Sequence, residues 1–270
     1  MNRLAASVHG VAAIMLAGLT SGAAAAPPQP TGAEPPATGR ACFDRPDGAY
    51  TSADFRHDFG VFSADHVFTR IVGKSLEVTF PEGRKIEGLR GGRVPVQAAR
   101  ILNLEYRVRY PHDFEAGLHG KQFGVAGGRG YTGGAGKECA EHGDGWSVRV
   151  QFDAHTRDIT NQIYVYHCRM TGDYGDDMGS GRQQISLQRG RWHLIRLRVS
   201  MQSRADAPDG RIELWQDGKQ RITIEGVQFV ARQSACEVDD VLLEAFCGGA
   251  GITPSHDNHV AFDDVRWWPE

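Results

Sequence analysis

Gly145–Cys168 reads GWSVRVQFDAHTRDITNQIYVYHC, and the order of apolar and polar residues in this stretch decides the fold. Apolar and polar residues alternate with a period of two in both halves, which is typical of β-strands that bury one face. One face of the two predicted strands carries Trp146, Val148, Val150, Phe152, Ile163 and Val165. The opposite face carries Ser147, Arg149, Gln151, Gln162, Tyr164 and Tyr166. We therefore predict two neighbouring strands with a polar face that could grip an acidic sugar chain.

The same alternation recurs along most of the chain, and helical patterns are scarce. The further predicted strands cover residues 67–72, 75–80, 100–110, 192–200, 211–216, 219–224, 241–247 and 259–268. Asp217-Gly218 separates two of these strands and is the signal of a tight hairpin turn. Short strands joined by Gly-rich turns predict an all-β, single-domain β-sandwich or jelly roll.

The N-terminal segment has the pattern of a secretory signal over residues 1–26. Its one charge is Arg3, an apolar run covers residues 11–19, and small residues at 23–26 offer a cleavage site. Residues 27–39 are rich in Pro and Ala and predict a flexible linker, followed by one domain over 40–270. We expect a secreted or periplasmic protein with no membrane partner, because no apolar run is long enough to span a bilayer.

Charge and cysteine content restrict the partners. The formal net charge of -3 argues against nucleic acid as a partner, so any polyanion site must be a local basic cleft. Five cysteines leave at least one thiol unpaired, and the favoured disulfide joins Cys236 to Cys247, which flank one predicted strand. The metal-ligating residue types considered were Cys139, His142, His167, Cys168, Asp173, Asp176, Asp177, His256, Asp257 and His259. Their spacing fits a zinc or calcium site poorly, and we expect neither metal nor cofactor.

Several motifs follow one another in an informative order. They are Gly120-Lys-Gln-Phe-Gly124, Trp146-Ser-Val-Arg149, Tyr164-Val-Tyr166-His167, Asp209–Gly218 and Phe246–Gly249. Together they resemble polysaccharide lyase family 14, which includes alginate lyases, although Gln122-Phe123 stands where that family has Leu-Pro. The resemblance implies a β-jelly-roll sandwich of two antiparallel sheets, a concave substrate cleft, and cleavage of uronic-acid polymers by β-elimination. It also implies site residues at Lys121, Ser147, Arg149, Tyr164 and Tyr166.

β-Elimination removes the C5 proton of a uronate and expels the glycosidic oxygen at C4. Lys121 and Arg149 are predicted to neutralise the uronate carboxylate, so that negative charge can spread into it. Tyr164 or Tyr166 is predicted to act as acid and base, because cationic neighbours favour the phenolate. The predicted substrate-binding residues are Ser147, Gln151, Gln162, Arg107 and His167. A glycosidase would need two carboxylates, and the predicted polar face carries none.

Two functions remain open. One is a lyase that cleaves 1,4-linked polyuronates such as alginate, polymannuronate or glucuronan and leaves unsaturated uronate ends. The alternative is a non-catalytic, lectin-like jelly roll that binds uronans. The simultaneous presence of Lys121, Arg149 and the tyrosine pair favours the lyase, because a binding module does not need the phenol. An acidic polysaccharide is the expected partner in either case, and we expect a monomer.

Overall fold

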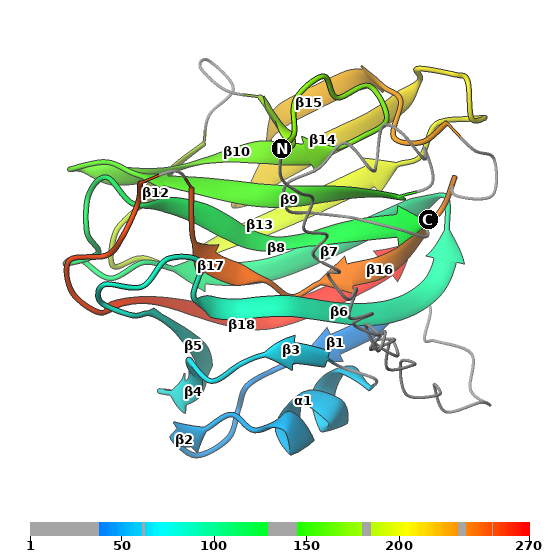
Figure 1. Ribbon diagram of the computed structural model, residues 1–270. Helices are drawn as coiled ribbons and strands as arrows, with labels where there is room; N and C mark the ends of the chain where they lie inside the picture. The colour runs from blue at the N-terminus through cyan, green and yellow to red at the C-terminus, as the bar shows by residue number, and fades with distance from the viewer. Residues whose placement is uncertain (1–37, 61–62, 129–144, 180–184, 232–235, 250) are drawn as a thin grey trace, which may run out of the picture. The chain divides into compact units, whose positions relative to one another are not determined.

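The computed structural model describes residues 38–60, 63–128, 145–179, 185–231, 236–249 and 251–270. The predicted signal (1–26) and almost all of the predicted linker (27–39) lie outside these residues. Two antiparallel sheets of nine strands each make up most of the described chain (Figure 1). The prediction of an all-β sandwich of two antiparallel sheets is therefore confirmed.

The first sheet holds seven of the predicted strands. Its order is β15-β14-β13-β7-β18-β5-β4-β2, and β1 pairs with β18. The strands are β1 (Gly39–Ala41), β2 (Gly48–Ala49), β4 (Thr69–Val72), β5 (Ser75–Phe80), β7 (Ile101–Arg109), β13 (His193–Ser200), β14 (Gly210–Gln216), β15 (Lys219–Val227) and β18 (Asn258–Pro269). Asp217 and Gly218 join β14 to β15 with φ values of 50° and 76°, as a primed hairpin turn requires.

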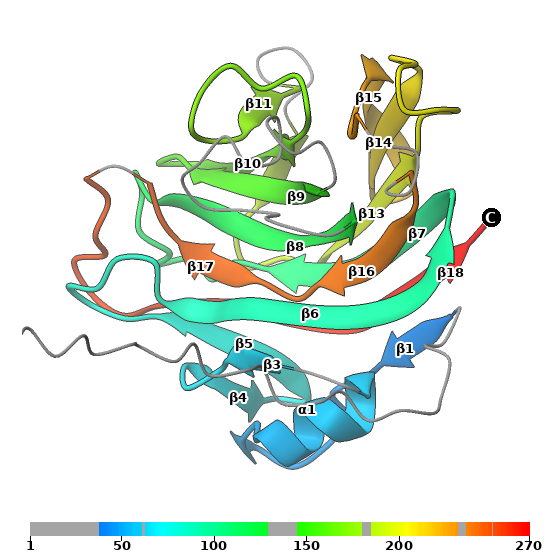
Figure 2. The same ribbon diagram turned by 45° about the vertical axis from the view of Figure 1, so that its right-hand side comes forward.

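The second sheet contains the opening stretch. Its order is β11-β10-β9-β8-β16-β6-β17, with β12 on β10 and β3 on β6. The strands are β3 (Ser63–Asp65), β6 (Gly88–Ala99), β8 (His119–Gly128), β9 (Gly145–Ala154), β10 (Asp158–Tyr166), β11 (Asp176–Met178), β12 (Ile185–Gln188), β16 (Val238–Leu242) and β17 (Ala245–Cys247). Figure 2 shows β11, β10, β9 and β8 side by side. The predicted pairing of the two strands in Gly145–Cys168 is confirmed.

The apolar face of β9 and β10 forms part of the core, as predicted. Trp146, Val148, Val150, Phe152, Ile163 and Val165 are all fully buried. Phe152 of the second sheet stacks on Phe80 of the first, with ring centroids 5.8 Å apart. The hydrophobic effect therefore fixes which face of β9 points inward, and the polar face must point the other way.

A polar network crosses this core at the position where the family motif has leucine. Gln122 of β8 is fully buried, and its side-chain carbonyl accepts a hydrogen bond of 2.8 Å from the Tyr106 hydroxyl. Its amide nitrogen donates to the Tyr110 hydroxyl at 2.8 Å and to Asn161 Oδ1 at 2.9 Å. Gln122 thus links the two sheets. The preceding residue on β8, Lys121, projects to the opposite face of its sheet, where it lies opposite Gln151 on β9.

The longest elements that were not predicted are β6, β8 and α1. Strands β6 and β8 contain several glycines, and β6 also contains Pro95, residues that are depleted in strands. At Gly124 a Cβ atom would lie 2.2 Å from the Val148 carbonyl oxygen, so glycine is needed where β8 meets β9. Helix α1 (Ser52–Phe59) begins with a capping box between Thr51 and Asp54, a local signal that the sequence does contain.

The predicted disulfide between Cys236 and Cys247 is wrong. Cys42, Cys168, Cys236 and Cys247, the cysteines within the described residues, all carry free thiols. Residues 241–247, predicted as one strand, span parts of two strands, β16 and β17. Both of these strands pair with β6. Val238 pairs with Ala99 at one end of β6, and Phe246 pairs with Gly88 at the other. Strands rise about 3.3 Å per residue, so this separation far exceeds the reach of a disulfide.

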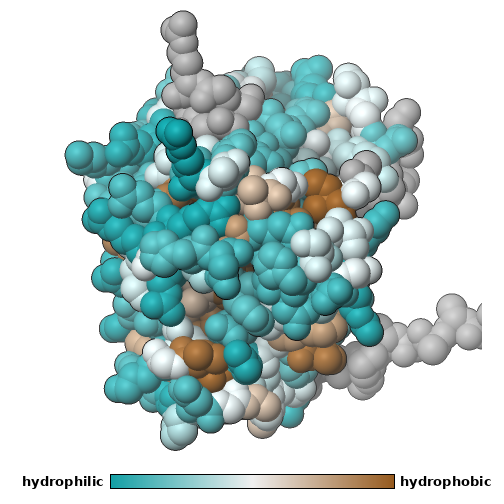
Figure 3. All heavy atoms as spheres, turned by 90° about the vertical axis from the view of Figure 1, so that its left-hand side faces the viewer, coloured by the Kyte–Doolittle hydropathy of each residue, from teal (hydrophilic) through white to brown (hydrophobic). Residues whose placement is uncertain are grey.

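The described surface is mostly polar. Figure 3 shows one face of the molecule, on which hydrophilic residues predominate and hydrophobic ones form small separate spots. The large hydrophobic side chains exposed among the described residues are Val67, Ile86 and Tyr174. In the same part of the chain, no helix is both long enough and apolar enough to cross a membrane.

Candidate active site

The register of three strands brings most of the predicted site residues onto one face. In the β9–β10 pair, Tyr164 lies opposite Arg149, Tyr166 opposite Ser147, and Gln162 opposite Gln151. Strand β8 adds Lys121, which lies opposite Gln151 on the other side of β9. Residues directly opposite one another in an antiparallel pair project to the same side of the sheet. Lys121, Ser147, Arg149, Gln151, Gln162, Tyr164 and Tyr166 therefore share this face.

The polar face is buried, which is unusual for a polar strand face. Ser147 is 0 % exposed, and Arg149 and Gln151 are each 6 % exposed. Lys121 and Tyr164 are only partly buried and so remain open to a ligand. Buried polar groups need hydrogen-bond partners, and the contacts of this face supply them.

Lys121 has an environment that favours its neutral form. Its amino group donates a hydrogen bond to Gln151 Oε1, and Nζ lies 3.2 Å from the centroid of the Tyr164 ring. Burial lowers the pKa of the Lys121 side chain from 10.5 to about 7. The charge of Asp177 opposes this shift, while that of Arg149 adds to it. Lys121 is thus able to exchange a proton near neutral pH.

Arg149 is held by two short hydrogen bonds. Its Nε donates to Glu244 Oε2 at 2.6 Å, and its Nη1 donates to Ser147 Oγ at 2.6 Å. The guanidinium carbon lies 6.0 Å from the centroid of the Tyr166 ring. Both members of the Arg149–Glu244 pair are nearly buried, so solvent screens this ion pair little.

The two tyrosines lie edge to face, with ring centroids 5.5 Å apart and an interplanar angle of 76°. Burial raises the pKa of Tyr164 above its ordinary value, and the hydrogen bond from Tyr166 opposes that shift. Burial and the same hydrogen bond raise the pKa of Tyr166 further. The charge of Arg149 lowers the pKa of both phenols, as predicted, but desolvation outweighs this effect and both pKa values stay above the ordinary value.

Carboxylates surround this face, contrary to the prediction that it carries none. Asp177 of β11 lies opposite Tyr164, and its Oδ1 accepts a hydrogen bond of 3.1 Å from Gln151 Nε2. Asp153 of β9 continues the alternation of the polar face beyond the predicted end of that strand, so the sequence pattern could have revealed it. Glu244 lies between β16 and β17, and no local pattern pointed to it. The described part of the site therefore carries mixed charge and is not simply basic.

Of the predicted substrate-binding residues, Arg107 lies on the other sheet, and His167 is paired at the edge of this one. Arg107 is on β7 of the first sheet, exposed, with its Nε 3.0 Å from Asp264 Oδ2. His167 follows β10 and is buried, and its Nε2 lies 2.7 Å from Asp176 Oδ2 on β11. Strand β7 belongs to the other sheet, so its arginine cannot join this face. The histidine instead ties the short edge strand β11 to β10.

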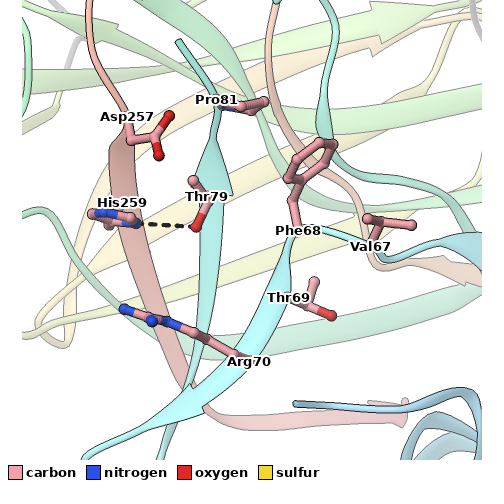
Figure 4. A pocket seen from close by; sticks show the side chains of 8 residues that line it. All are labelled: Val67, Phe68, Thr69, Arg70, Thr79, Pro81, Asp257 and His259. Atoms are coloured by element: carbon pink, nitrogen blue, oxygen red, sulfur yellow. Dashed lines mark hydrogen bonds between the residues drawn. The ribbon is translucent and has the colours of Figure 1, made fainter. Parts of the chain in front are cut away.

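The described residues contain no group of three or more side chains suited to hold a metal ion. Of the residues considered for zinc, Cys139 and His142 lie outside the described ranges. A cavity of about 460 Å³ is present on the first sheet, lined in part by Phe68, Arg70 and His259 (Figure 4). Its polar groups pair with one another or with nearby protein groups, for example Thr79 Oγ1 with His259 Nδ1 at 3.1 Å. None of the predicted site residues lines it.

Comparisons with known proteins point to one family and one fold. The family model for polysaccharide lyase 14 matches residues 73–265. The alginate lyase Aly36B superposes with a TM-score of 0.74 at 21% identity, covering 87% of this chain and 97% of that one. A mutant of the same enzyme in complex with an alginate trisaccharide gives 0.76 at 21% identity, covering 87% and 99%. The alginate lyase vAL-1 from Chlorella virus gives 0.59 at 13% identity, covering 77% and 90%. These likenesses confirm the predicted jelly-roll fold, and a search of curated proteins found no match.

Proposed function

Because the chain belongs to the polysaccharide lyase 14 family and is therefore a polysaccharide lyase, we propose that it cleaves 1,4-linked polyuronates by β-elimination. The observation that carries this proposal is that one sheet face brings together a partly buried lysine, a buried arginine and a tyrosine pair. Burial on this face lowers the pKa of the lysine to about 7. Elimination from a uronate needs a base, an acid and a cation at the carboxylate, and this face offers one of each. The solved relatives support a uronan substrate, since they are alginate lyases.

The reaction begins with proton abstraction. Neutral Lys121 takes the proton from C5 of the uronate, and the electron pair of the broken C–H bond stays on C5. Negative charge that develops at C5 spreads into the carboxylate, where the Arg149 guanidinium stabilises it. These roles differ from those predicted from the sequence, in which a tyrosine was the base. The pKa of Lys121 supports the change, because a general base works best when its pKa is near the working pH.

Bond cleavage completes the elimination. The electron pair on C5 forms the C4=C5 double bond as the C4–O4 bond breaks, and the leaving oxygen takes a proton from the Tyr164 hydroxyl. The raised pKa of Tyr164 keeps its phenol protonated until this step, as a general acid requires. Tyr164 is preferred over Tyr166 because it is less buried and its pKa is raised less. Exchange of protons with solvent then restores neutral Lys121 and protonated Tyr164.

The test is direct. The protein is incubated with polymannuronate, polyguluronate, glucuronan and mixed alginate, and the ultraviolet absorbance of the new C4=C5 double bond is followed. We expect absorbance to grow on at least one of these polymers, and the pattern names the substrate. Binding to a uronan with no absorbance change from acid to alkaline pH would refute the lyase and favour the binding module.

A pH profile separates the two roles considered for Lys121. If neutral Lys121 is the base, kcat/KM rises with pH through an apparent pKa of about 7 and levels off above it. If the ammonium form instead neutralises the carboxylate, kcat/KM falls with pH through the same value. We expect the rising profile, measured at constant ionic strength from initial rates at low substrate concentration. A falling profile would mean that a group other than Lys121 is the base.

The N-terminal pattern supports a further proposal about location. Residues 1–26 have the charge, apolar run and small residues of a secretory signal, and the linker that follows is flexible in composition. A secreted or periplasmic protein would meet polymers that do not enter the cytoplasm. Detection of mature protein that begins near residue 27 in the exported fraction tests this.

A further inference from the structure

Glu244 lies in the break between β16 and β17 and turns its carboxylate toward the site. Its Oε2 accepts the 2.6 Å hydrogen bond from Arg149 Nε, and its Oε1 accepts a hydrogen bond of 3.2 Å from the backbone N–H of Gly91 on β6. The residue is 8 % exposed. A carboxylate removed from water is costly unless charge-assisted hydrogen bonds compensate it, and both of its oxygens have such a donor.

These contacts fix the direction of the Arg149 guanidinium. The guanidinium is a rigid planar fork, so holding two of its nitrogens determines where the whole group lies. Glu244 holds Nε, and Ser147 holds Nη1. Loss of Glu244 would remove the contact at Nε, one of the two that fix the plane of the guanidinium.

We propose that Glu244 is a positioning residue for the elimination, which holds the Arg149 guanidinium in the one orientation that receives the uronate carboxylate. This inference rests on the proposed function. Glu244 also balances the charge of Arg149 before substrate arrives. Selection of a uronate then depends on the placement of the fork more than on excess positive charge, in keeping with the mixed charge of this face.

The experiment is a double-mutant cycle with Glu244→Gln and Arg149→Gln. Glu244→Gln keeps the size of the side chain. Its amide N–H would face one of the two N–H donors of this site, Arg149 Nε or the Gly91 backbone. We expect kcat/KM to fall about 100-fold, mostly in kcat, because a misplaced group raises the barrier more than it weakens binding. In the Arg149→Gln background the same change is expected to have no further effect on kcat/KM within about twofold.

Thermal unfolding of the same four proteins reports the pair independently of catalysis. Arg149→Gln leaves a buried carboxylate without its cation, and we expect Tm to fall by about 10 °C. The double variant is expected to recover most of this loss. A matched control is Glu213→Gln on β14, another buried glutamate paired with arginines, Arg198 and Arg211, in the other sheet. It should lower Tm without changing kcat/KM.

The outcomes distinguish the possible failures. Wild-type kcat/KM in Glu244→Gln overturns the positioning role. So does a fall in kcat/KM that is as large in the Arg149→Gln background as in the wild type. In both cases, activity of the wild-type protein still supports the proposed function. No product from the wild type on any uronan overturns the proposed function itself, whatever the Tm values. If Glu244→Gln does not fold, Arg149→Lys carries the test. It keeps the charge pair but not the fork, so Tm should stay within a few degrees while kcat/KM falls about 100-fold. Wild-type kcat/KM in that variant overturns the proposal.

Discussion

Replacement of Lys121 by methionine is expected to lower kcat/KM on the uronan substrate by about 10³-fold, because it removes the base that takes the C5 proton. Methionine has a similar length and no ionisable group, so the packing against Tyr164 is largely kept. Initial rates of double-bond formation give the measurement. Lys219→Met on β15, where the lysine is exposed, is the control and should retain wild-type rates.

Lys121→Arg separates proton transfer from charge. Arginine stays protonated in proteins, so it can neutralise a carboxylate but cannot accept the C5 proton near neutral pH. We expect this variant to be nearly as inactive as Lys121→Met. Substantial activity in Lys121→Arg would mean that position 121 serves as a cation, and that another group is the base.

Tyr164→Phe is expected to lower kcat by about 10² to 10³-fold with little change in KM, because the leaving oxygen loses its proton donor. The aromatic ring and its contact with the Lys121 amino group remain. Tyr166→Phe should cost less, about tenfold, since Tyr166 acts through its hydrogen bond to Tyr164. Tyr174→Phe, an exposed tyrosine that precedes β11, is the control for the loss of a phenol.

The comparison of the two tyrosine variants decides the assignment. A far larger loss in Tyr166→Phe than in Tyr164→Phe would move the acid to Tyr166. Losses below about tenfold in both would exclude acid catalysis by a phenol at this site. The two measurements together also test the electrostatic argument, since the acid is expected to be the tyrosine whose pKa is raised less.

The roles proposed for Lys121 and the two tyrosines differ from those predicted from the sequence because these side chains are buried in the structure. On an exposed face, a lysine keeps its proton near neutral pH and a neighbouring arginine would favour a phenolate. In the structure, desolvation disfavours every charged form, so Lys121 tends toward the neutral amine and the two phenols toward their protonated form. Lysine therefore becomes the better base, and tyrosine the better acid.

Local sequence was a sound guide to the strands that alternate strictly. β9 and β10 and the hairpin at Asp217-Gly218 lie where they were predicted, because a period of two can bury one face only as a strand. It failed for β6 and β8, where glycines meet neighbouring backbone at close range. It also failed at residues 243–244, where an apparently continuous strand is interrupted.

The sequence by itself determined the fold class, the inward face of the central strand pair, and a set of residues that share its outer face. Apolar side chains are buried away from water, and in a strand with one buried face this places them at every second residue. The alternation can therefore be recognised in the sequence. Only the tertiary structure decided that the outer face is buried and that Arg149 is paired with Glu244, 95 positions away in the chain. It likewise decided that Asp177 comes to lie beside Gln151 and that Arg107 lies apart from the site. Desolvation and ion pairing depend on groups brought together across strands, and no local pattern encodes them.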